Sequence, residues 1–205
     1  MYTLYGSPGT ASLAPHCMLE EVGAPYAFVP VDISGETRDP AYLKLNPHGR
    51  VPTLVVNDKP IFESAAICVW LADRYPQAGL APAVDAEERA IYMQWMMYLT
   101  NTVQENLLQF LDPHLYTTHL DETPHIVEKG RTRVDAAFGV IEKALKDQGP
   151  YLLGRTPSAA DIYLSMLAGW YEGQEAFAQA FPMIEANRKQ LALRPGMARA
   201  LAVNG

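Results

Sequence analysis

The feature that most constrains the fold is a proline placed directly before an apolar, strand-forming run. It lies in residues 46–67, NPHGRVPTLVVNDKPIFESAAI, where Val51-Pro52 precedes the run TLVV at 53–56. Because proline supplies no N–H to the hydrogen-bond ladder of a sheet, Pro52 must lie at an edge or at a bend. Such a proline often follows a cis peptide bond, which leaves the backbone groups of the preceding residue open to another extended chain. Val51-Pro52 therefore predicts an edge at which a peptide binds.

The same stretch predicts a helix start that can hold charge. A turn at 57–60 leads into a second short strand, and Glu63-Ser64 ends that strand and begins a helix. A Glu-Ser pair at a helix N-terminus brings backbone N–H groups, a hydroxyl and a carboxylate together. An ordinary helix start with serine as its cap uses the same residues, but Val51-Pro52 upstream favours a ligand site.

Composition and charge exclude several classes of protein. The chain has 205 residues and a formal net charge of -7, and its Lys and Arg are scattered, whereas a nucleic-acid-binding protein shows a basic patch. No stretch approaches the length that crosses a bilayer, and the N-terminal sequence MYTLYGSPG lacks the features of a signal peptide. Cys17 and Cys68 form no Cys-x-x-Cys motif, and the histidines show no metal-ligand spacing. We expect a cytoplasmic protein with no metal and with neither nucleic acid nor membrane as a partner.

Alternation and helical periodicity predict the order of elements in the first part of the chain. The order is strand, helix, strand, polar loop, short helix, strand, strand and helix, at 2–5, 12–22, 26–31, 34–38, 39–45, 53–56, 60–62 and 65–74. Gly23 closes the first helix as a C-terminal cap. Because a strand-helix-strand unit crosses over right-handed, the first two strands are predicted to be parallel.

Beyond a Gly- and Pro-containing linker at 77–84, the pattern is helical throughout. Predicted helices run over 86–111, 124–146, 162–171, 182–193 and 195–203. Asp85 is placed to cap the first of them. Ser158 and Asp161 have the spacing of a capping box, so we assign both to folding and not to catalysis.

Motifs and element order together resemble a cytosolic glutathione S-transferase, over nearly the whole length. Val51-Pro52 resembles the cis-proline with which that family pairs the cysteinyl backbone of glutathione. Glu63-Ser64 resembles the acidic or amide residue plus Ser that holds the γ-glutamyl group, and the run 158–161 matches the helical capping box of the family.

The resemblance implies a fold and a set of partners. It implies an α/β N-terminal thioredoxin-like domain (β-α-β-β-α) that binds glutathione over 1–76, followed by the linker at 77–84. An all-α C-terminal helical domain over 85–205 contributes the electrophile pocket. Glutathione is the implied co-substrate, without a metal, and the implied assembly is a cytoplasmic homodimer with a small hydrophobic electrophile as substrate.

The turn YGSPGTASLAPH at 5–16 further resembles the bacterial beta-type branch, with two departures. Beta-type enzymes read Pro-Gly-Ala-Cys-Ser here, with the Cys against the glutathione sulfur, and this chain has Ala11 at the Cys position. A His of the first long helix corresponds to Gln104, counted from Trp95. Mixed-disulfide chemistry thus loses its nucleophile, and Cys17, on the apolar face of its helix, does not replace it.

The implied chemistry needs a group that stabilises the thiolate of glutathione. A free thiol has a pKa of about 8.5, so only a few per cent is ionised at neutral pH. A helix N-terminus and a hydroxyl donor both favour the anion. The candidate hydroxyls are Ser12 first, Thr10 second and Tyr5 third. Ser12 could equally act only as the helix N-cap.

Further residues are candidates for binding. His48 and Arg50, in the loop before Pro52, could meet a carboxylate of glutathione, although exposed loop charges fit equally well. The predicted walls of the electrophile pocket, on the first long helix, are Gln104, Leu108 and Leu111.

Three functional hypotheses follow. The first is a glutathione transferase with a detoxifying role that activates the thiolate for attack on small hydrophobic electrophiles. The second is a non-catalytic glutathione-binding or stress protein of the same fold, which the missing Cys and His favour. The third is a specialised glutathione-dependent dehalogenase, isomerase or ether-cleaving enzyme.

Overall fold

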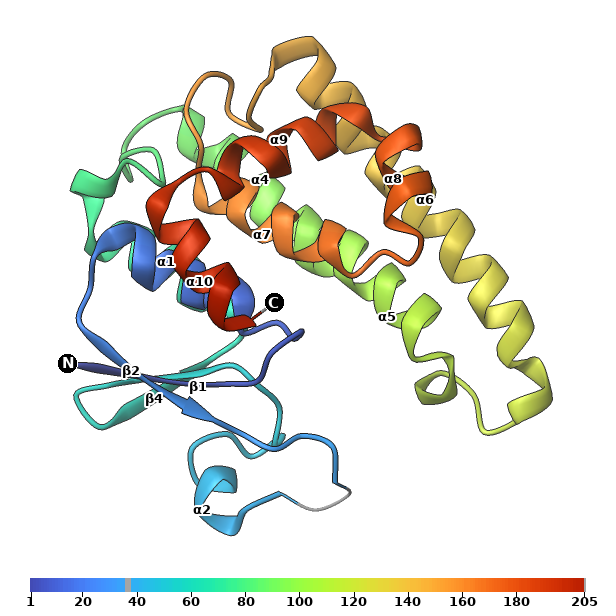
Figure 1. Cartoon of the computed structure of the whole chain (residues 1–205), viewed down its shortest axis with the longest axis horizontal. Coiled ribbons are helices and arrows are strands. Elements are labelled where there is room, and N and C mark those ends of the chain that lie inside the picture. Colours follow the sequence, from blue (N-terminus) through green and yellow to red (C-terminus); the bar gives the residue numbers. More distant parts are fainter. Residues whose placement is uncertain (36–37, 205) are drawn as a thin grey trace. The chain divides into compact units, whose positions relative to one another are not determined.

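The computed structural model describes residues 1–35 and 38–204 and divides into two compact units (Figure 1). The units are Met1–Val84 with Gln190–Gly205, and Asp85–Lys189. The polar loop predicted at 34–38 falls partly on residues 36–37, which lie outside the described residues. The predicted fold class, an α/β part followed by a helical part, is confirmed.

The first unit is built on a four-stranded mixed sheet in the order β2-β1-β3-β4. Its strands are β1 Tyr2–Gly6, β2 Tyr26–Pro30, β3 Thr53–Val56 and β4 Lys59–Phe62. β2 is parallel to β1, whereas β3 is antiparallel to β1, and β4 is antiparallel to β3. The predicted parallel pair is therefore confirmed.

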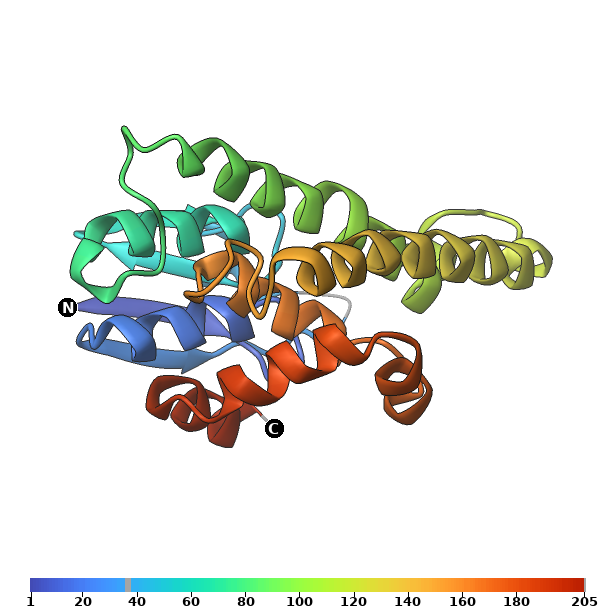
Figure 2. The ribbon, with the colours of Figure 1, turned by 90° about the horizontal axis from the view of Figure 1, so that it is seen from above.

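Helices cover the faces of this sheet. They are α1 Leu13–Val22, α2 Pro40–Leu43, α3 Ser64–Arg74 and α10 Pro195–Asn204, with a 3-10 turn at Pro76–Ala78. Figure 1 shows α1 and α10 on one face and α2 on the other, and Figure 2 shows α1 beside α3. Gly23 has φ 67° and ends α1, as the sequence predicts. Apolar side chains from the sheet and helices form the core, among them Leu4, Met18, Leu54, Ile67 and Leu71.

The hairpin between β3 and β4 is tighter than the sequence pattern indicates. Val56 pairs with Lys59, so the loop holds only Asn57 and Asp58, both with positive φ (47° and 63°). Asn and Asp tolerate this conformation better than other residues that have a Cβ. Pro60, which the sequence places at the end of the turn and the start of the second strand, lies within the edge strand β4, where its missing N–H costs no ladder bond.

The C-terminal segment packs on the first unit, which differs from the predicted helical domain over 85–205. Arg194 and Glu21 form an ion pair, with 2.5 Å from Nη2 to Oε2, and Arg199 Nε lies 2.5 Å from Glu20 Oε2. A Cβ on Gly196 would lie 2.8 Å from the backbone nitrogen of Glu21, so only glycine permits this approach of α10 to α1. The ion pairs and this close approach together attach the segment to the first unit.

The second unit is helical. Its elements are α4 Glu88–Tyr98, a π-helical turn at Leu99–Gln104, α5 Glu105–Leu111, 3-10 turns at Pro113–Leu115 and Leu120–Glu122, α6 Thr123–Gln148, α7 Ala159–Gly169, α8 Gln174–Ala180 and α9 Pro182–Ala192, which crosses the boundary at Lys189. The long predicted helices are present, and α8 is an addition that the sequence pattern did not indicate.

Two details of the first long helix correct the prediction. Asp85 does not cap it, because α4 begins at Glu88 and Glu87 occupies the N-cap position. The expected single helix to Leu111 is interrupted by the π turn. Hydrophobic periodicity does not reveal one extra backbone residue per turn, so the interruption could not be predicted from the pattern.

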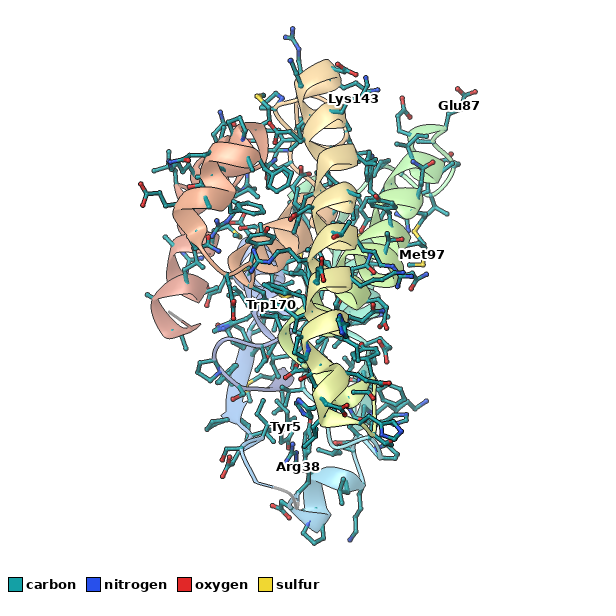
Figure 3. All side chains as sticks on the ribbon, turned by 90° about the vertical axis from the view of Figure 1, so that its right-hand side faces the viewer. Tyr5, Arg38, Glu87, Met97, Lys143 and Trp170 are labelled. Atoms are coloured by element: carbon teal, nitrogen blue, oxygen red, sulfur yellow. The ribbon has the colours of Figure 1, made fainter. Side chains whose placement is uncertain are left out.

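The long helix α6 packs closely on α5. The apolar side chains of Val134, Phe138, Ile141 and Leu145 are buried, while that of Val127 is half-buried. A Cβ on Gly130 would lie 2.9 Å from the backbone nitrogen of Phe110, so the glycine sets how near the helices come. Lys143 near the other end of α6 projects into solvent and pairs with Asp147 (Figure 3).

The predicted capping box at the start of α7 is confirmed. Asp161 is fully buried and accepts hydrogen bonds from the N–H and the hydroxyl of Ser158 (2.8 Å each) and from the N–H of Leu152 (2.8 Å). Asn187 Nδ2 donates a further bond at 3.1 Å. Burial raises the pKa of Asp161 although these bonds favour its charged form. The carboxylate thus ties α7, α9 and the preceding loop together.

No helix within residues 1–35 and 38–204 has both the length and the apolar character needed to span a membrane.

Candidate active site

The pairing of the strands brings three separate segments to one end of the sheet. Tyr5, Thr53 and Phe62 lie opposite one another across β1, β3 and β4. Because β3 is antiparallel to both neighbours, its start lies beside the ends of β1 and β4. The turn after β1, the pair Val51-Pro52 before β3 and the helix start after β4 therefore meet at this end.

The turn after β1 contains a closed cluster of hydroxyls. Ser12 Oγ accepts the N–H of Ser7 at 3.0 Å and lies 3.0 Å from the carbonyl oxygen of the same residue. Thr10 Oγ1 donates to that carbonyl at 2.6 Å and lies 2.5 Å from Ser12 Oγ. Both side chains thus share one acceptor, and the cluster stands immediately before the N-terminus of α1.

The two hydroxyls of this cluster differ in access. Ser12 is 0% exposed, whereas Thr10 is only partly buried. Ser12 occupies the N-cap position of α1, as the alternative interpretation predicts, although its side-chain oxygen makes no bond to the N–H groups of the first turn. The backbone of Ser7 uses that oxygen instead. Thr10 is therefore the hydroxyl that a ligand reaches more easily.

The helix start after β4 has an unusual backbone. Glu63 is exposed and adopts φ 71° and ψ 105°, a region that residues with a Cβ rarely populate. It occupies the N-cap position of α3, and Ser64 is the buried first residue of the helix. The alternative in which Ser64 is the N-cap is thus wrong. Strained backbone of this kind concentrates at ligand sites.

The loop before β3 holds Val51-Pro52 in the cis form that the sequence predicts. His48 and Arg50 are both exposed. The ring of His48 lies edge-on to that of Phe62, with 6.4 Å between the centroids. Both candidate side chains are thus at the surface of the first unit.

Tyr5 faces away from the hydroxyl cluster. Alternate strand residues point to opposite faces, and Leu4 is fully buried in the core. The ring of Tyr5 (Figure 3) instead packs on Tyr42, with 5.7 Å between the centroids. It lines a hollow of about 530 Å³ with the end of β2 and the region of α2. This placement makes Tyr5 the weakest of the three catalytic candidates.

Neither cysteine has the environment of a nucleophile. Burial raises the pKa of Cys17 to about 12 and raises that of Cys68 well above its ordinary value. His16 is also buried, and its Nε2 lies 2.6 Å from the hydroxyl of Tyr26. Burial lowers the pKa of His16, against the opposing effect of the Glu20 carboxylate. These groups support the structure around α1.

The candidates for the electrophile pocket lie in the second unit. Gln104 ends the π turn and accepts a hydrogen bond from the hydroxyl of Tyr163. Leu108 and Leu111 are half-buried on α5. Helical periodicity brings all three to one side of this segment.

Two family models match the chain. Residues 1–73 match the glutathione S-transferase N-terminal domain, and residues 124–186 match the glutathione S-transferase C-terminal domain. The chain belongs to the glutathione S-transferase family. A curated relative is the glutathione S-transferase GstA of Escherichia coli O157:H7, which is 27% identical over 205 residues and 98% of each chain.

Solved structures of transferases share the whole fold. A bacterial beta class glutathione S-transferase of Sphingomonas chungbukensis has a TM-score of 0.85 and 32% identity, covering 99% of this chain and 98% of its own. A glutathione transferase homologue from Sulfitobacter, solved with bound glutathione, has a TM-score of 0.88 and 29% identity, covering 99% and 98%. The beta-type resemblance is therefore supported by structure as well as by motif.

Sequence reasoning missed three side chains of this transferase that contact the loop before β3. They are Arg38, Tyr42 and Asn46. Asn46 stands in the motif NPHG, but an asparagine before a proline is also a common turn residue. Within the described ranges 1–35 and 38–204, no group of His, Cys, Asp or Glu is arranged to hold a metal ion.

Proposed function

We propose that this transferase binds glutathione at the end of the sheet where β1, β3 and β4 meet, and activates its thiol. The cysteinyl backbone pairs with Val51 next to Pro52, and the γ-glutamyl group lies at Glu63-Ser64. His48 and Arg50 are exposed side chains of the same loop that can meet a carboxylate of glutathione. The observation that carries the proposal is the convergence of the three segments at this end. The Sulfitobacter relative, which holds glutathione, supports it.

The thiolate is stabilised by the start of α1 and by a hydroxyl. No acidic residue lies in the first turn of α1, so nothing there offsets the positive end of the helix dipole. Thr10 donates to the sulfur in preference to Ser12, because Ser12 is fully buried. To do so, Thr10 turns its single hydroxyl proton from the carbonyl of Ser7 to the sulfur. Tyr5 is the remaining candidate. The thiol proton passes to solvent.

The thiolate then attacks a small hydrophobic electrophile. Sulfur forms a bond to the electrophilic carbon, and a leaving group such as chloride departs with its bonding electron pair. Gln104, Leu108 and Leu111 are the proposed walls for the electrophile. Because Ala11 stands where beta-type enzymes have Cys, no mixed disulfide forms with glutathione at that position.

Glutathione binding and conjugation test this function. We expect calorimetry to show one glutathione site per chain, and chlorodinitrobenzene to be conjugated faster than in buffer. Ser64→Ala should raise the Kd for glutathione about tenfold, since hydrogen bonds to charged groups are strong. The matched control is Ser165→Ala on α7, which should bind normally. Absence of glutathione binding overturns the proposal, and binding without turnover leaves the non-catalytic alternative.

We also propose that the protein acts as a cytoplasmic homodimer, as the family resemblance implies. Sedimentation equilibrium should give twice the chain mass of 22.7 kDa. A chain that sediments as a monomer at micromolar concentration would contradict the dimer.

A further inference from the structure

Three side chains spaced four residues apart converge on the loop before β3. Arg38 Nε donates to the carbonyl oxygen of Gly49 at 2.9 Å. Tyr42 and Asn46 both donate to the carbonyl oxygen of Arg50, the hydroxyl at 2.6 Å and Nδ2 at 2.8 Å. A carbonyl oxygen has two lone pairs, so these two donors saturate it.

The two donors to Arg50 are held rigidly. Tyr42 is 5% exposed and Asn46 is 3% exposed, so water does not compete for these bonds. The hydroxyl of Tyr42 also lies 3.0 Å from Oγ1 of the fully buried Thr53. Asn46 Oδ1 accepts the N–H of His48 at 3.1 Å. Each donor therefore has a second bond that fixes its orientation.

Arg38 holds the same loop from a different direction. Besides Gly49, its guanidinium donates to the carbonyl oxygen of Ile33 at 2.9 Å and to that of Gly35. Gly49 has φ 63°, and a Cβ there would lie 2.7 Å from Cγ of Arg38. The glycine thus lets the arginine side chain lie against the backbone just before Arg50.

The rigidity of the peptide unit carries this restraint to the next residue. The carbonyl of Arg50 and the N–H of Val51 lie in one plane and, in a trans peptide, point in opposite directions. The carbonyl points at the buried Tyr42 and Asn46, so the N–H of Val51 points away from them. Two buried side chains therefore decide the direction of a backbone donor that neither of them contacts.

We propose that Tyr42 and Asn46 are positioning residues for glutathione, because they aim the backbone of Val51 at the cysteinyl part of the tripeptide. The inference rests on the proposed glutathione site at Val51. Neither side chain touches glutathione in this proposal. Both act through the carbonyl of Arg50, so their loss should weaken binding without slowing the chemical step.

Two conservative substitutions test the inference. Tyr42→Phe removes only the hydroxyl, and Asn46→Asp removes the donor while keeping the shape. We expect calorimetry to show that Tyr42→Phe raises the Kd for glutathione roughly threefold to tenfold. This change corresponds to the net contribution of one or two neutral hydrogen bonds. The kcat at saturating glutathione should stay within about twofold of the wild-type value. Asn46→Asp should have a larger effect on Kd, because a carboxylate would face a carbonyl oxygen.

Matched controls make the same chemical changes at other sites of the first unit, so that an effect of the site can be distinguished from an effect of the substitution. Tyr75→Phe removes a hydroxyl that donates to Tyr2 in the same unit, and Asn57→Asp adds the same charge at the exposed hairpin. Both should bind glutathione as the wild type does. Amide exchange of the peptide covering 50–53, measured without glutathione, should be faster in Tyr42→Phe and Asn46→Asp and unchanged in the controls.

The outcomes distinguish this inference from the proposed function. Wild-type protein that binds no glutathione overturns the proposed function, and the inference with it. Wild-type protein that binds glutathione, with Tyr42→Phe and Asn46→Asp binding equally well, overturns the inference alone. A fall in kcat with an unchanged Kd also overturns it, because a positioning residue for binding acts on affinity. Unchanged exchange at 50–53 has the same consequence.

Discussion

At the scale of single residues, the turn after β1 shows how the fold separates two equivalent-looking hydroxyls. Ser12 and Thr10 are two positions apart and share the carbonyl of Ser7 as an acceptor. Ser12 is fully enclosed, and its oxygen organises the turn. Thr10 is partly open. We therefore assign Ser12 to the shape of the turn and propose Thr10 as the donor to the thiolate.

Thr10→Val should raise the apparent pKa in the pH profile of kcat/KM by about one to two units. The physical reason is the loss of a hydrogen bond to a charged sulfur, which stabilises the anion by about 1.5–3 kcal/mol, while one pKa unit corresponds to about 1.4 kcal/mol. Conjugation rates measured from pH 6 to 9 with chlorodinitrobenzene provide the measurement, over a range chosen around the thiol pKa of about 8.5.

Two further variants serve as a control for Thr10→Val and as a test of Ser12 as the alternative donor. Thr132→Val, on the exposed side of α6, should leave the profile unchanged. Ser12→Ala should lower stability, because the N–H of Ser7 loses its acceptor. An unshifted profile in Thr10→Val together with a shifted one in Ser12→Ala would show that Ser12 is the donor after all.

At the scale of elements, α10 is attached to α1 by charge as well as by apolar packing. Glu21 is almost fully buried and accepts from Arg194 Nε at 2.7 Å and from the N–H of Met197 at 2.9 Å. The neighbouring residue Glu20 forms an ion pair with Arg199. Adjacent carboxylates of α1 thus fix both the start and the middle of the last helix.

Glu21→Gln should lower the free energy of unfolding by about 1–3 kcal/mol. The amide keeps the size of the side chain but leaves the Arg194 guanidinium without its charged partner and weakens the bond to Met197. Urea unfolding followed by circular dichroism measures the change. Glu87→Gln, which is exposed at the start of α4 (Figure 3), is the matched control and should change stability by less than about 0.5 kcal/mol. Equal stability of the two variants would show that the charge pair does not hold α10.

At the scale of the whole molecule, stability depends on a buried titratable chain in the first unit. His16 stacks on Phe28 and contacts the hydroxyl of Tyr26, which in turn donates to Glu20. Burial acts to raise the pKa of Glu20, but its bonds from Tyr26 and Arg199 outweigh it and lower the pKa overall. Both His16 and Glu20 thus have a folded-state pKa below the unfolded value.

Stability should therefore fall as pH decreases below the ordinary His pKa of 6.5. In that range the unfolded chain binds a proton at His16 that the folded chain does not. Lowering the pH therefore favours the unfolded state and decreases the free energy of unfolding. The slope from this one group is at most about 1.4 kcal/mol per pH unit. Glu20 adds to the loss only at lower pH, below its own ordinary value of 4.5. The raised pKa of Asp161 acts in the opposite direction there.

The variant His16→Gln isolates this contribution. Urea unfolding at pH 7.0, 6.0 and 5.5, a range set by the ordinary His pKa of about 6.5, should show a smaller loss of stability in the variant than in the wild type. His125→Gln, an exposed residue of α6, should follow the wild type. Parallel curves for wild type and His16→Gln would mean that His16 is not the group that titrates.

Local patterns and short motifs were sufficient to predict the elements and several of their contacts. Strand alternation, helical periodicity and Gly23 predicted the order of the elements, and Val51-Pro52 predicted a cis bond that the structure contains. Ser158 and Asp161, three positions apart, predicted a capping box that the structure contains. Each of these features depends on residues close together in the chain, so a few consecutive positions are enough to predict it.

Which of these groups meet depends on how distant segments pack together. Tyr5 packs on Tyr42, and Ser12 is enclosed. Arg38, Tyr42 and Asn46 converge on one loop, although the sequence pattern indicated no role for any of the three. The pairing of α10 with α1 joins residues more than 170 positions apart. Burial and long-range hydrogen bonds arise only when distant segments pack together. The stretch around Val51-Pro52 therefore indicates a ligand from sequence alone, whereas the packing beneath it decides which way its backbone points.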